Sequence, residues 1–145
     1  MSSATLEKLP EWAGEMLAGS RHGHLGLLDT GSHPRVLPVT YALYEDALYS
    51  AVDEKPKREP RRGLARVRFL RRRPQAALTV DRYDDDWHEL AWVQVLGRVE
   101  ILDIQGSPGA VQALCAKYPQ YRGEPPPGPL LKLVPERALC WRAEG

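Results

Sequence analysis

The residues best suited to chemistry lie in one run, LYSAVDEKPKREPRR, in which a strand-like segment passes into a cationic loop. Tyr49 and Ser50 would place hydroxyl groups at the edge of the strand, and three cations follow where the backbone leaves it: Lys55, Lys57 and Arg58. Lysine is a compact partner for phosphate, and arginine binds phosphate through two parallel hydrogen bonds. The run suits a ligand with an apolar ring and a phosphate tail. Because no glycine-rich cradle accompanies it, its spacing alone favours a solvated basic loop.

The elements that must position this run are predicted from the spacing of apolar residues. Pro10 and Gly19 bound a short helix within residues 1–20, which begin as a loose tail. After this helix the period changes, and three successive strands are predicted: HLGLLD, RVLPVTYAL and ALYSAV. A helix is then predicted over residues 60–72, with apolar residues on one stripe and arginines over most of its remaining surface.

The second half of the chain predicts three more strands and one more helix. The strands are QAALTVDRY, ELAWVQVLGRVEILD and LLKLVPERALCWRA, and Gly97 marks a bulge in the middle one. Ser107 and Pro108 form an N-cap and first-turn pair for a helix that runs through Lys117. Strands grouped at hairpin spacing favour an antiparallel barrel. We therefore expect a mainly β protein with six strands and short helices, in which residues 21–145 form the single domain.

Length and charge restrict the class of protein. The chain of 145 residues and 16.3 kDa suffices for one domain with its own core. Twenty basic and nineteen acidic residues give a net charge of +1, so we expect no general attraction to nucleic acid or to membranes. The sequence has two cysteines, no charged-then-apolar leader and no apolar stretch long enough to cross a membrane. These features predict a soluble, cytoplasmic protein.

The charges are unevenly distributed along the chain. Residues 55–73 contain ten lysines or arginines and one acid, whereas residues 81–89 contain five acids and one arginine. Such segregation indicates a binding surface or two faces that meet. The basic helix lacks the interleaved aromatic residues of a nucleic-acid platform, so we expect it to face solvent or an acidic partner. The acidic run predicts a solvated hairpin tip, or a patch that faces the basic helix of a partner subunit.

Metal and nucleophile sites find little support in the sequence. His22 and His24 share one side of a predicted strand and His33 follows in a turn, but nothing fixes a third ligand for zinc. The acidic run has consecutive acids and no glycine, unlike a calcium loop. Cys115 and Cys140 lack metal-ligand spacing and are predicted as small core residues. No nucleophile with a base and an orienting group is recognisable. We therefore predict no metal and identify no catalytic residue.

The order of these blocks resembles that of a known family. LPVTYAL, LYSAVDEKPKR, the arginine-rich helix, ALTVDRYDDDW and WVQVLGRVEIL follow one another as in the flavin- and deazaflavin-binding split-barrel proteins, the relatives of pyridoxamine 5′-phosphate oxidase. More narrowly, VDEKPKR, YDDDW and AKYPQYRGEPPPGP resemble the branch that uses the deazaflavin coenzyme F420. The resemblance covers residues 21–142 and lies in the order and spacing of the blocks together. It implies a six-stranded split β-barrel.

The resemblance also implies a homodimer with two cofactors at the subunit interface. The residues implied along the ring system are Leu37, Pro38, Val39 and Thr40. The residues implied at the ribityl chain are Tyr49, Ser50 and Ala51, and those implied at the phosphate are Lys55, Lys57 and Arg58. Near the long strand and the C-terminus, the candidates for contacts from the second subunit are Trp92 and Trp141. Candidates for contact with an acidic cofactor tail are Arg61, Arg62 and Arg66.

The implied function is hydride transfer between reduced F420 and a small electrophilic molecule, such as an activated double bond or a quinone-like ring. The cofactor would make the bond change while the protein orients it, clamps its phosphate and excludes water. The same barrel with FMN is the nearest alternative, and a non-catalytic flavin carrier or a nucleic-acid-binding barrel are others. The ring strand lacks the lysine of pyridoxamine 5′-phosphate oxidases and the chain finishes CWRAEG. Vitamin B6 oxidation is therefore not expected.

Overall fold

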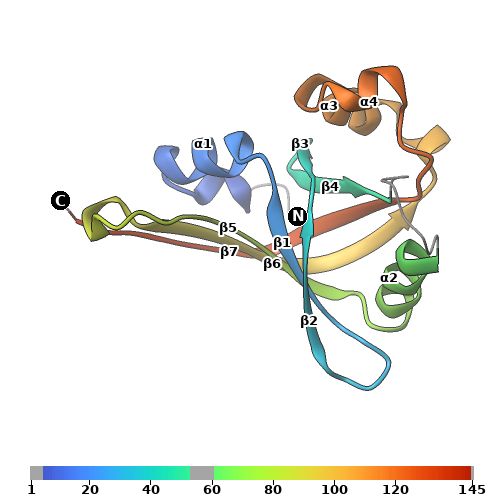
Figure 1. The fold of residues 1–145 in the computed structure, drawn as a ribbon, viewed down its shortest axis with the longest axis horizontal. Helices are drawn as coiled ribbons and strands as arrows, with labels where there is room; N and C mark the ends of the chain where they lie inside the picture. Colours follow the sequence, from blue (N-terminus) through green and yellow to red (C-terminus); the bar gives the residue numbers. More distant parts are fainter. Residues whose placement is uncertain (1–4, 53–60, 145) are drawn as a thin grey trace.

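The computed structural model describes residues 5–52 and 61–144, with backbone alone at residues 61–64 (Figure 1). The described residues form one antiparallel sheet of seven strands: β1 (Gly23–Leu28), β2 (Pro34–Val39), β3 (Ala42–Tyr44), β4 (Ala47–Ala51), β5 (Gln75–Arg82), β6 (Ala91–Leu102) and β7 (Leu130–Arg142). Within the same residues, four α-helices accompany the sheet: α1 (Glu11–Gly19), α2 (Arg61–Arg72), α3 (Pro108–Lys117) and α4 (Gln120–Gly123). None of these described helices is long and apolar enough to cross a membrane.

The sheet is closed into a split barrel by one short link. Its strand order is β2-β1-β5-β6-β7-β4-β3, so β2 and β3 are its two edges. Only Thr40 and Tyr41 separate these two strands along the chain. Because consecutive Cα atoms are about 3.8 Å apart, the two edges cannot be more than about 11 Å apart at this point. The sheet must therefore curl until its edges meet, although β2 and β3 do not pair.

The described sheet has one strand more than the six that the sequence pattern predicts. RVLPVTYAL has the apolar pattern of one strand, but it forms β2 and β3 with a break between them. At the break, the backbone N–H of Tyr41 donates to the Tyr118 hydroxyl at 3.1 Å. The Tyr41 side chain is fully buried, and its hydroxyl donates to the carbonyl of Leu17. These bonds to distant segments replace the sheet pairing and turn the chain onto the opposite edge.

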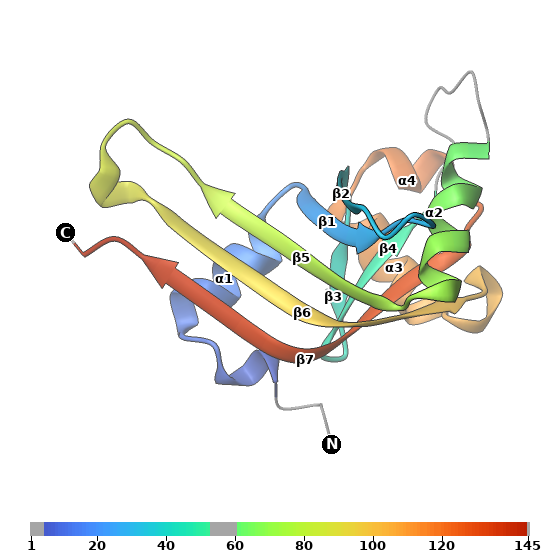
Figure 2. The ribbon, with the colours of Figure 1, turned by 90° about the horizontal axis from the view of Figure 1, so that it is seen from below.

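Strands β5, β6 and β7 continue beyond the barrel as a flat arm, which points to the left in Figure 1. The register between β6 and β7 shifts at Gly97, so the bulge predicted there is confirmed. Helix α1 packs on one face of the arm and contributes Ala13 and Leu17 to the main core. In Figure 2, which shows the molecule from below, the other face lies in front of the helices. Within the described residues, no helix covers that face of the arm.

The second layer of the fold lies over β3 and β4. Helices α3 and α4 bury Leu114, Tyr118 and Tyr121 against this part of the sheet, in a cluster separate from the barrel interior. The strand β4 is buried on both faces, because the barrel core lies on one side and α3 on the other. The predicted helix after Ser107 is confirmed, although the Ser107 side chain makes no capping hydrogen bond.

The Gly97 bulge supplies a test of this packing. An added Cβ at Gly97 would lie 2.0 Å from the backbone oxygen of Val134, and a backbone atom cannot move aside cheaply. We expect Gly97→Ala to lower the free energy of unfolding by about 1–3 kcal/mol or more. Gly14→Ala is the matched control, because a Cβ there meets nothing within 4 Å and should stabilise α1 by about 0.5–1 kcal/mol. Urea denaturation measures both, and equal stability of the Gly97 variant and the wild type would contradict the packing described.

Candidate functional site

The predicted ring strand, β2, forms an edge of the sheet and exposes one of its faces. Leu37 and Val39 point into the barrel core, whereas Pro38 and Val36 are exposed, Val36 by 67%. Among the described residues, no strand pairs with the other side of β2, so this edge presents its outer N–H and C=O groups to a ligand. Thr40 is half-buried, and its hydroxyl shares a 2.8 Å hydrogen bond with the hydroxyl of Tyr121. The strand thus presents an apolar face and a polar edge together.

The predicted ribityl contacts on β4 are all buried in the described chain. Tyr49 and Ala51 belong to the cluster beneath α3, where the Tyr49 ring lies 6.0 Å from that of Tyr44. Ser50 points the other way and lines an apolar cavity of about 10 Å³ inside the barrel. A cavity of this size holds at most one water molecule. The sequence alone gave no sign that α3 would cover this strand, because the helix lies about sixty residues further along the chain.

The predicted phosphate clamp, Lys55, Lys57 and Arg58, lies outside the described residues. The point at which the chain leaves the sheet before these residues is fixed by two hydrogen bonds. The N–H of Val52 donates to the Pro129 carbonyl at 3.0 Å, and the N–H of Gly128 donates to the Val52 carbonyl at 3.2 Å. The connection from β4 to α2 therefore starts from a rigid anchor. The tail candidates Arg61 and Arg62 lie in the first turn of α2, and Arg66 is half-buried on the same helix.

Trp92 and Trp141 are brought together by the structure, although they are far apart in the sequence. They are direct partners in the β6–β7 register and are exposed by 37% and 46%. The pairings across the sheet place Pro38, His24, Thr79, Gln94 and Leu139 in one row. Side chains alternate between the faces of a strand, so the two tryptophans, two residues further along, lie on the same face as this row. This uncovered face also carries Val36, in the row of Gly26, Ala77 and Leu96.

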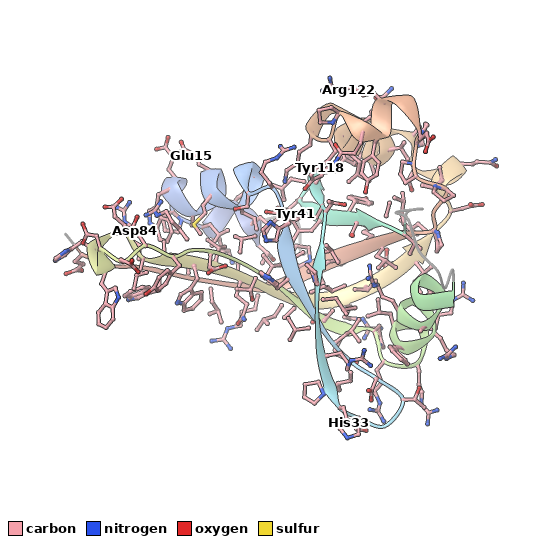
Figure 3. All side chains as sticks on the ribbon, viewed as in Figure 1. Glu15, His33, Tyr41, Asp84, Tyr118 and Arg122 are labelled. Atoms are coloured by element: carbon pink, nitrogen blue, oxygen red, sulfur yellow. The ribbon has the colours of Figure 1, made fainter. Side chains whose placement is uncertain are left out.

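A cluster that the sequence analysis missed lies beside the link between β2 and β3. The Tyr118 hydroxyl accepts from the Tyr41 N–H, and its one hydrogen is shared between the carbonyl of Arg21 at 2.8 Å and that of Tyr41 at 3.1 Å. The ammonium group of Lys117 lies 3.9 Å from the centre of the Tyr41 ring; Figure 3 labels Tyr41 and Tyr118. Among the described residues this ammonium group has no hydrogen-bond acceptor. The block AKYPQY carries part of the family resemblance, but its spacing gave no sign of these contacts, which span 77 residues.

Burial changes the ionisation of this cluster. Burial, and after it the positive charge of Arg21, lowers the pKa of Lys117 to about 8. Burial raises the pKa of Tyr118, and burial together with the nearby Tyr118 raises the pKa of Tyr41 well above its usual value. The two tyrosines are thus neutral, and their hydroxyl groups link distant backbone segments by hydrogen bonds. The contact of Lys117 with the Tyr41 ring favours the charged amine and opposes part of the effect of burial.

The three histidines considered for zinc do not converge on one point in the structure. His24 lies on the uncovered face opposite Pro38, and His22 packs edge-on against it, with ring centres 5.4 Å apart. His33 lies at the tip of the β1–β2 hairpin, beside Asp29 (Figure 3). Over residues 5–52 and 61–144, no three groups from histidine, cysteine, aspartate and glutamate are placed to hold a metal ion.

Solved structures of other proteins share this fold. A heme-binding protein from Mycobacterium smegmatis is 20% identical with a TM-score of 0.72, and the match covers 94% of this chain and 56% of that one. A FAD-binding protein from Mesorhizobium loti is 21% identical with a TM-score of 0.66, covering 91% and 94% of the two chains. An F420 reductase is 18% identical with a TM-score of 0.62, covering 90% and 98%. No family model and no curated protein sequence matches the chain.

These neighbours show the fold alone, so the cofactor has to be argued from the residues. Their three names mention three different cofactors, and at 18–21% identity only the fold is shared. The chain's own features must therefore distinguish between them.

The Lys117 cluster predicts a specific dependence of stability on pH. The pKa of Lys117 is about 8 in the folded chain and near the ordinary 10.5 when unfolded, so between these values the unfolded chain binds more protons. The wild type should therefore gain stability relative to Lys117→Met as the pH rises from 8 to 10. Urea denaturation of both proteins at each pH measures the difference between their free energies of unfolding. Contributions from the titration of tyrosines cancel in this difference, because both proteins have the same tyrosines. Lys8→Met is the control at an exposed lysine. A difference that stays constant with pH would show that Lys117 is not held in this environment.

Proposed function

We propose that the chain is an oxidoreductase that works as a homodimer, binds the deazaflavin coenzyme F420 between its two copies and transfers hydride to a small electrophilic organic molecule. The observation that carries the proposal is the uncovered face of the sheet, which bears both β2 and the Trp92–Trp141 pair. Strands β2 and β6 are three strand spacings apart, about 14 Å. A second copy packed on this face is the simplest way for β2 and the tryptophans to meet at one cofactor.

The described residues fit a flat cofactor at β2. Val36 and Pro38 offer an apolar surface to a ring, and the free edge of the strand offers backbone groups to the polar rim of that ring. The ribityl phosphate attached to the ring would then extend toward the connection after β4. In the sequence, this connection contains the three cations of the predicted phosphate clamp. The buried β4 gives this region a rigid base, because its side chains are packed on both faces.

When bound, the coenzyme supplies the hydride chemistry. In this proposal the chain's own residues bind it, orient it and exclude water from it. Lys55, Lys57 and Arg58 would donate charge-assisted hydrogen bonds to the phosphate. Trp92 and Trp141 of the second copy would close the ring site against solvent, since large aromatic side chains bury much area at such interfaces. The proton donor to the substrate is not assigned to any residue.

The charge of the basic segment favours F420 over FMN. Both share a ring system and a ribityl phosphate, but the F420 tail carries several more acidic groups. Residues 55–73 have an excess of nine positive charges, more than one phosphate requires. The first half of α2, with Arg61, Arg62 and Arg66, follows the clamp directly and would bind the acidic tail. FMN in the same site stays the alternative.

A binding experiment tests the cofactor and its clamp together. Purified protein titrated with F420, FMN, FAD and heme should bind F420 most tightly, as followed by quenching of coenzyme or protein fluorescence. The double variant Lys55→Ala, Lys57→Ala should bind F420 at least tenfold more weakly, because each charge-assisted bond contributes about 1.5–3 kcal/mol.

Lys8→Ala is the control for this experiment, because Lys8 is exposed on the 3₁₀ turn Leu6–Lys8 outside the proposed site. Unchanged F420 affinity in the double variant would remove the two lysines from the site. Tighter binding of FMN, FAD or heme than of F420 would reject the F420 assignment.

The proposed dimer is tested at Val36. Its side chain is largely exposed, so Val36→Asp should change the free energy of unfolding by less than about 0.5 kcal/mol. A carboxylate desolvated at the interface should instead weaken self-association at least tenfold, measured by sedimentation velocity over a dilution series. Ala18→Asp, at an exposed position of α1 on the covered side of the sheet, should leave self-association unchanged. Equal self-association of the wild type and Val36→Asp would contradict a dimer through this face.

A further inference from the structure

The second half of α2 presents cations that form no ion pair with a described residue. Arg68, Arg71 and Arg72 are exposed, and none of them forms an ion pair with a described residue. Arg68 lies over the ring of its neighbour Phe69, at 5.6 Å from the ring centre. The next arginine, Arg73, differs, because it donates to the Ser32 hydroxyl at 2.6 Å and so ties the helix to the β1–β2 hairpin. The end of α2 is therefore a fixed positive surface.

The opposite charge lies at the tip of the arm, in residues 83–90 between β5 and β6. Its carboxyl groups belong to Asp84, Asp85, Asp86 and Glu89, all exposed (Figure 3 labels Asp84). Two of them shape the turn, because Asp84 accepts from the N–H of Asp86 and Asp86 accepts from that of His88. No lysine or arginine among the described residues forms an ion pair with these acids.

The tip also exposes large aromatic side chains. Tyr83 is exposed by 68% and Trp87 by 69%, at the end of the same arm that carries Trp92 and Trp141. Two large aromatic side chains exposed in one short turn favour an interaction surface over a solvated loop. Carboxylates among the aromatics repel phosphate backbones and anionic lipid surfaces, so the complementary partner is a protein surface rich in arginine. The chain itself carries such a surface on α2.

The geometry of a two-fold dimer connects these two surfaces. The arm tip and α2 lie at opposite ends of the molecule (Figures 1 and 2), so they cannot meet within one copy. In a dimer with two-fold symmetry, each contact from the first copy to the second is repeated from the second to the first. When the two-fold axis lies across the long direction of the arm, packing through the uncovered face reverses that direction in one copy relative to the other. This brings the arm of each copy toward the α2 end of its partner.

We propose that the acidic, aromatic tip of each arm docks on the second half of α2 in the other copy, forming two equivalent ionic contacts that hold the dimer together. This proposal rests on the homodimer of the proposed function. It divides α2 into a first half that faces the cofactor tail and a second half, Arg68, Arg71 and Arg72, that faces the partner's arm. The contact would thereby hold α2, and with it the cofactor site, in place through the partner.

Two charge-reversal variants test the contact between the arm tip of one copy and α2 of the other. The tip variant is Asp84→Lys, Asp85→Lys, and the helix variant is Arg71→Glu, Arg72→Glu. Each alone places like charges at both contacts and should weaken the dimer at least tenfold in 50 mM NaCl, with a smaller effect in 500 mM NaCl. An equimolar mixture of the two variants restores opposite charges at both contacts. It should form a heterodimer with a dissociation constant within about threefold of the wild type, as measured by sedimentation velocity.

The control variant is Glu11→Lys, Glu15→Lys, which makes the same change of charge as the tip variant, but on the exposed side of α1 (Figure 3 labels Glu15). It should leave the dimer unchanged. The proposal is overturned if the reversals do not weaken the dimer, if the mixture does not recover, or if the wild type is a monomer. Reversal variants that stay dimeric but lose F420 would place these arginines at the cofactor. Recovery of the heterodimer without any cofactor binding would support the contact and reject the proposed function.

Discussion

The two-residue link between the edges of one sheet is the constraint on which this structure depends. Thr40 and Tyr41 join β2 to β3, and the sheet can satisfy so short a connection only by curling into a barrel. Closure gives the two halves of the long strands different roles. The halves that form the barrel bury a core, while the outer halves of β5, β6 and β7 project as an arm with one face that no described helix covers.

The link is held by contacts from elements that are distant in sequence. Tyr118, from the end of α3, bonds to the backbone of Tyr41 and of Arg21, and Tyr121 bonds to Thr40. The same helices cover β4, so the part of the sheet that was expected to contact a ribityl chain is packed rather than open. The proposed cofactor site therefore consists of β2, the cations that follow β4 in the sequence and the uncovered face. In the proposed dimer, β2 and the uncovered face would be completed by the second copy.

The local features of the fold could be predicted from the sequence, and the long-range ones could not. The limits of α1, β5, β6 and β7 and the bulge at Gly97 agree with the predicted pattern, because periodicity, proline and glycine act within a few residues. The break after Val39 was missed because it is made by Tyr118, which no local pattern connects to Tyr41. For the site, Val36 and Pro38 of β2 are exposed because no described helix covers their face of the sheet, which the local pattern does not reveal. The pairing of Trp92 with Trp141 required the register of two strands.

The central claim is that the cofactor is bound between two copies that meet on the uncovered face of the sheet. Sedimentation velocity recorded at the visible absorbance of F420 tests it most directly, with protein concentrations on both sides of the dimer dissociation constant. The coenzyme should sediment only with the dimer, at one molecule per chain, and should be released as the dimer dissociates on dilution. Coenzyme that sediments with the monomer, or that sediments with neither species, would contradict the account.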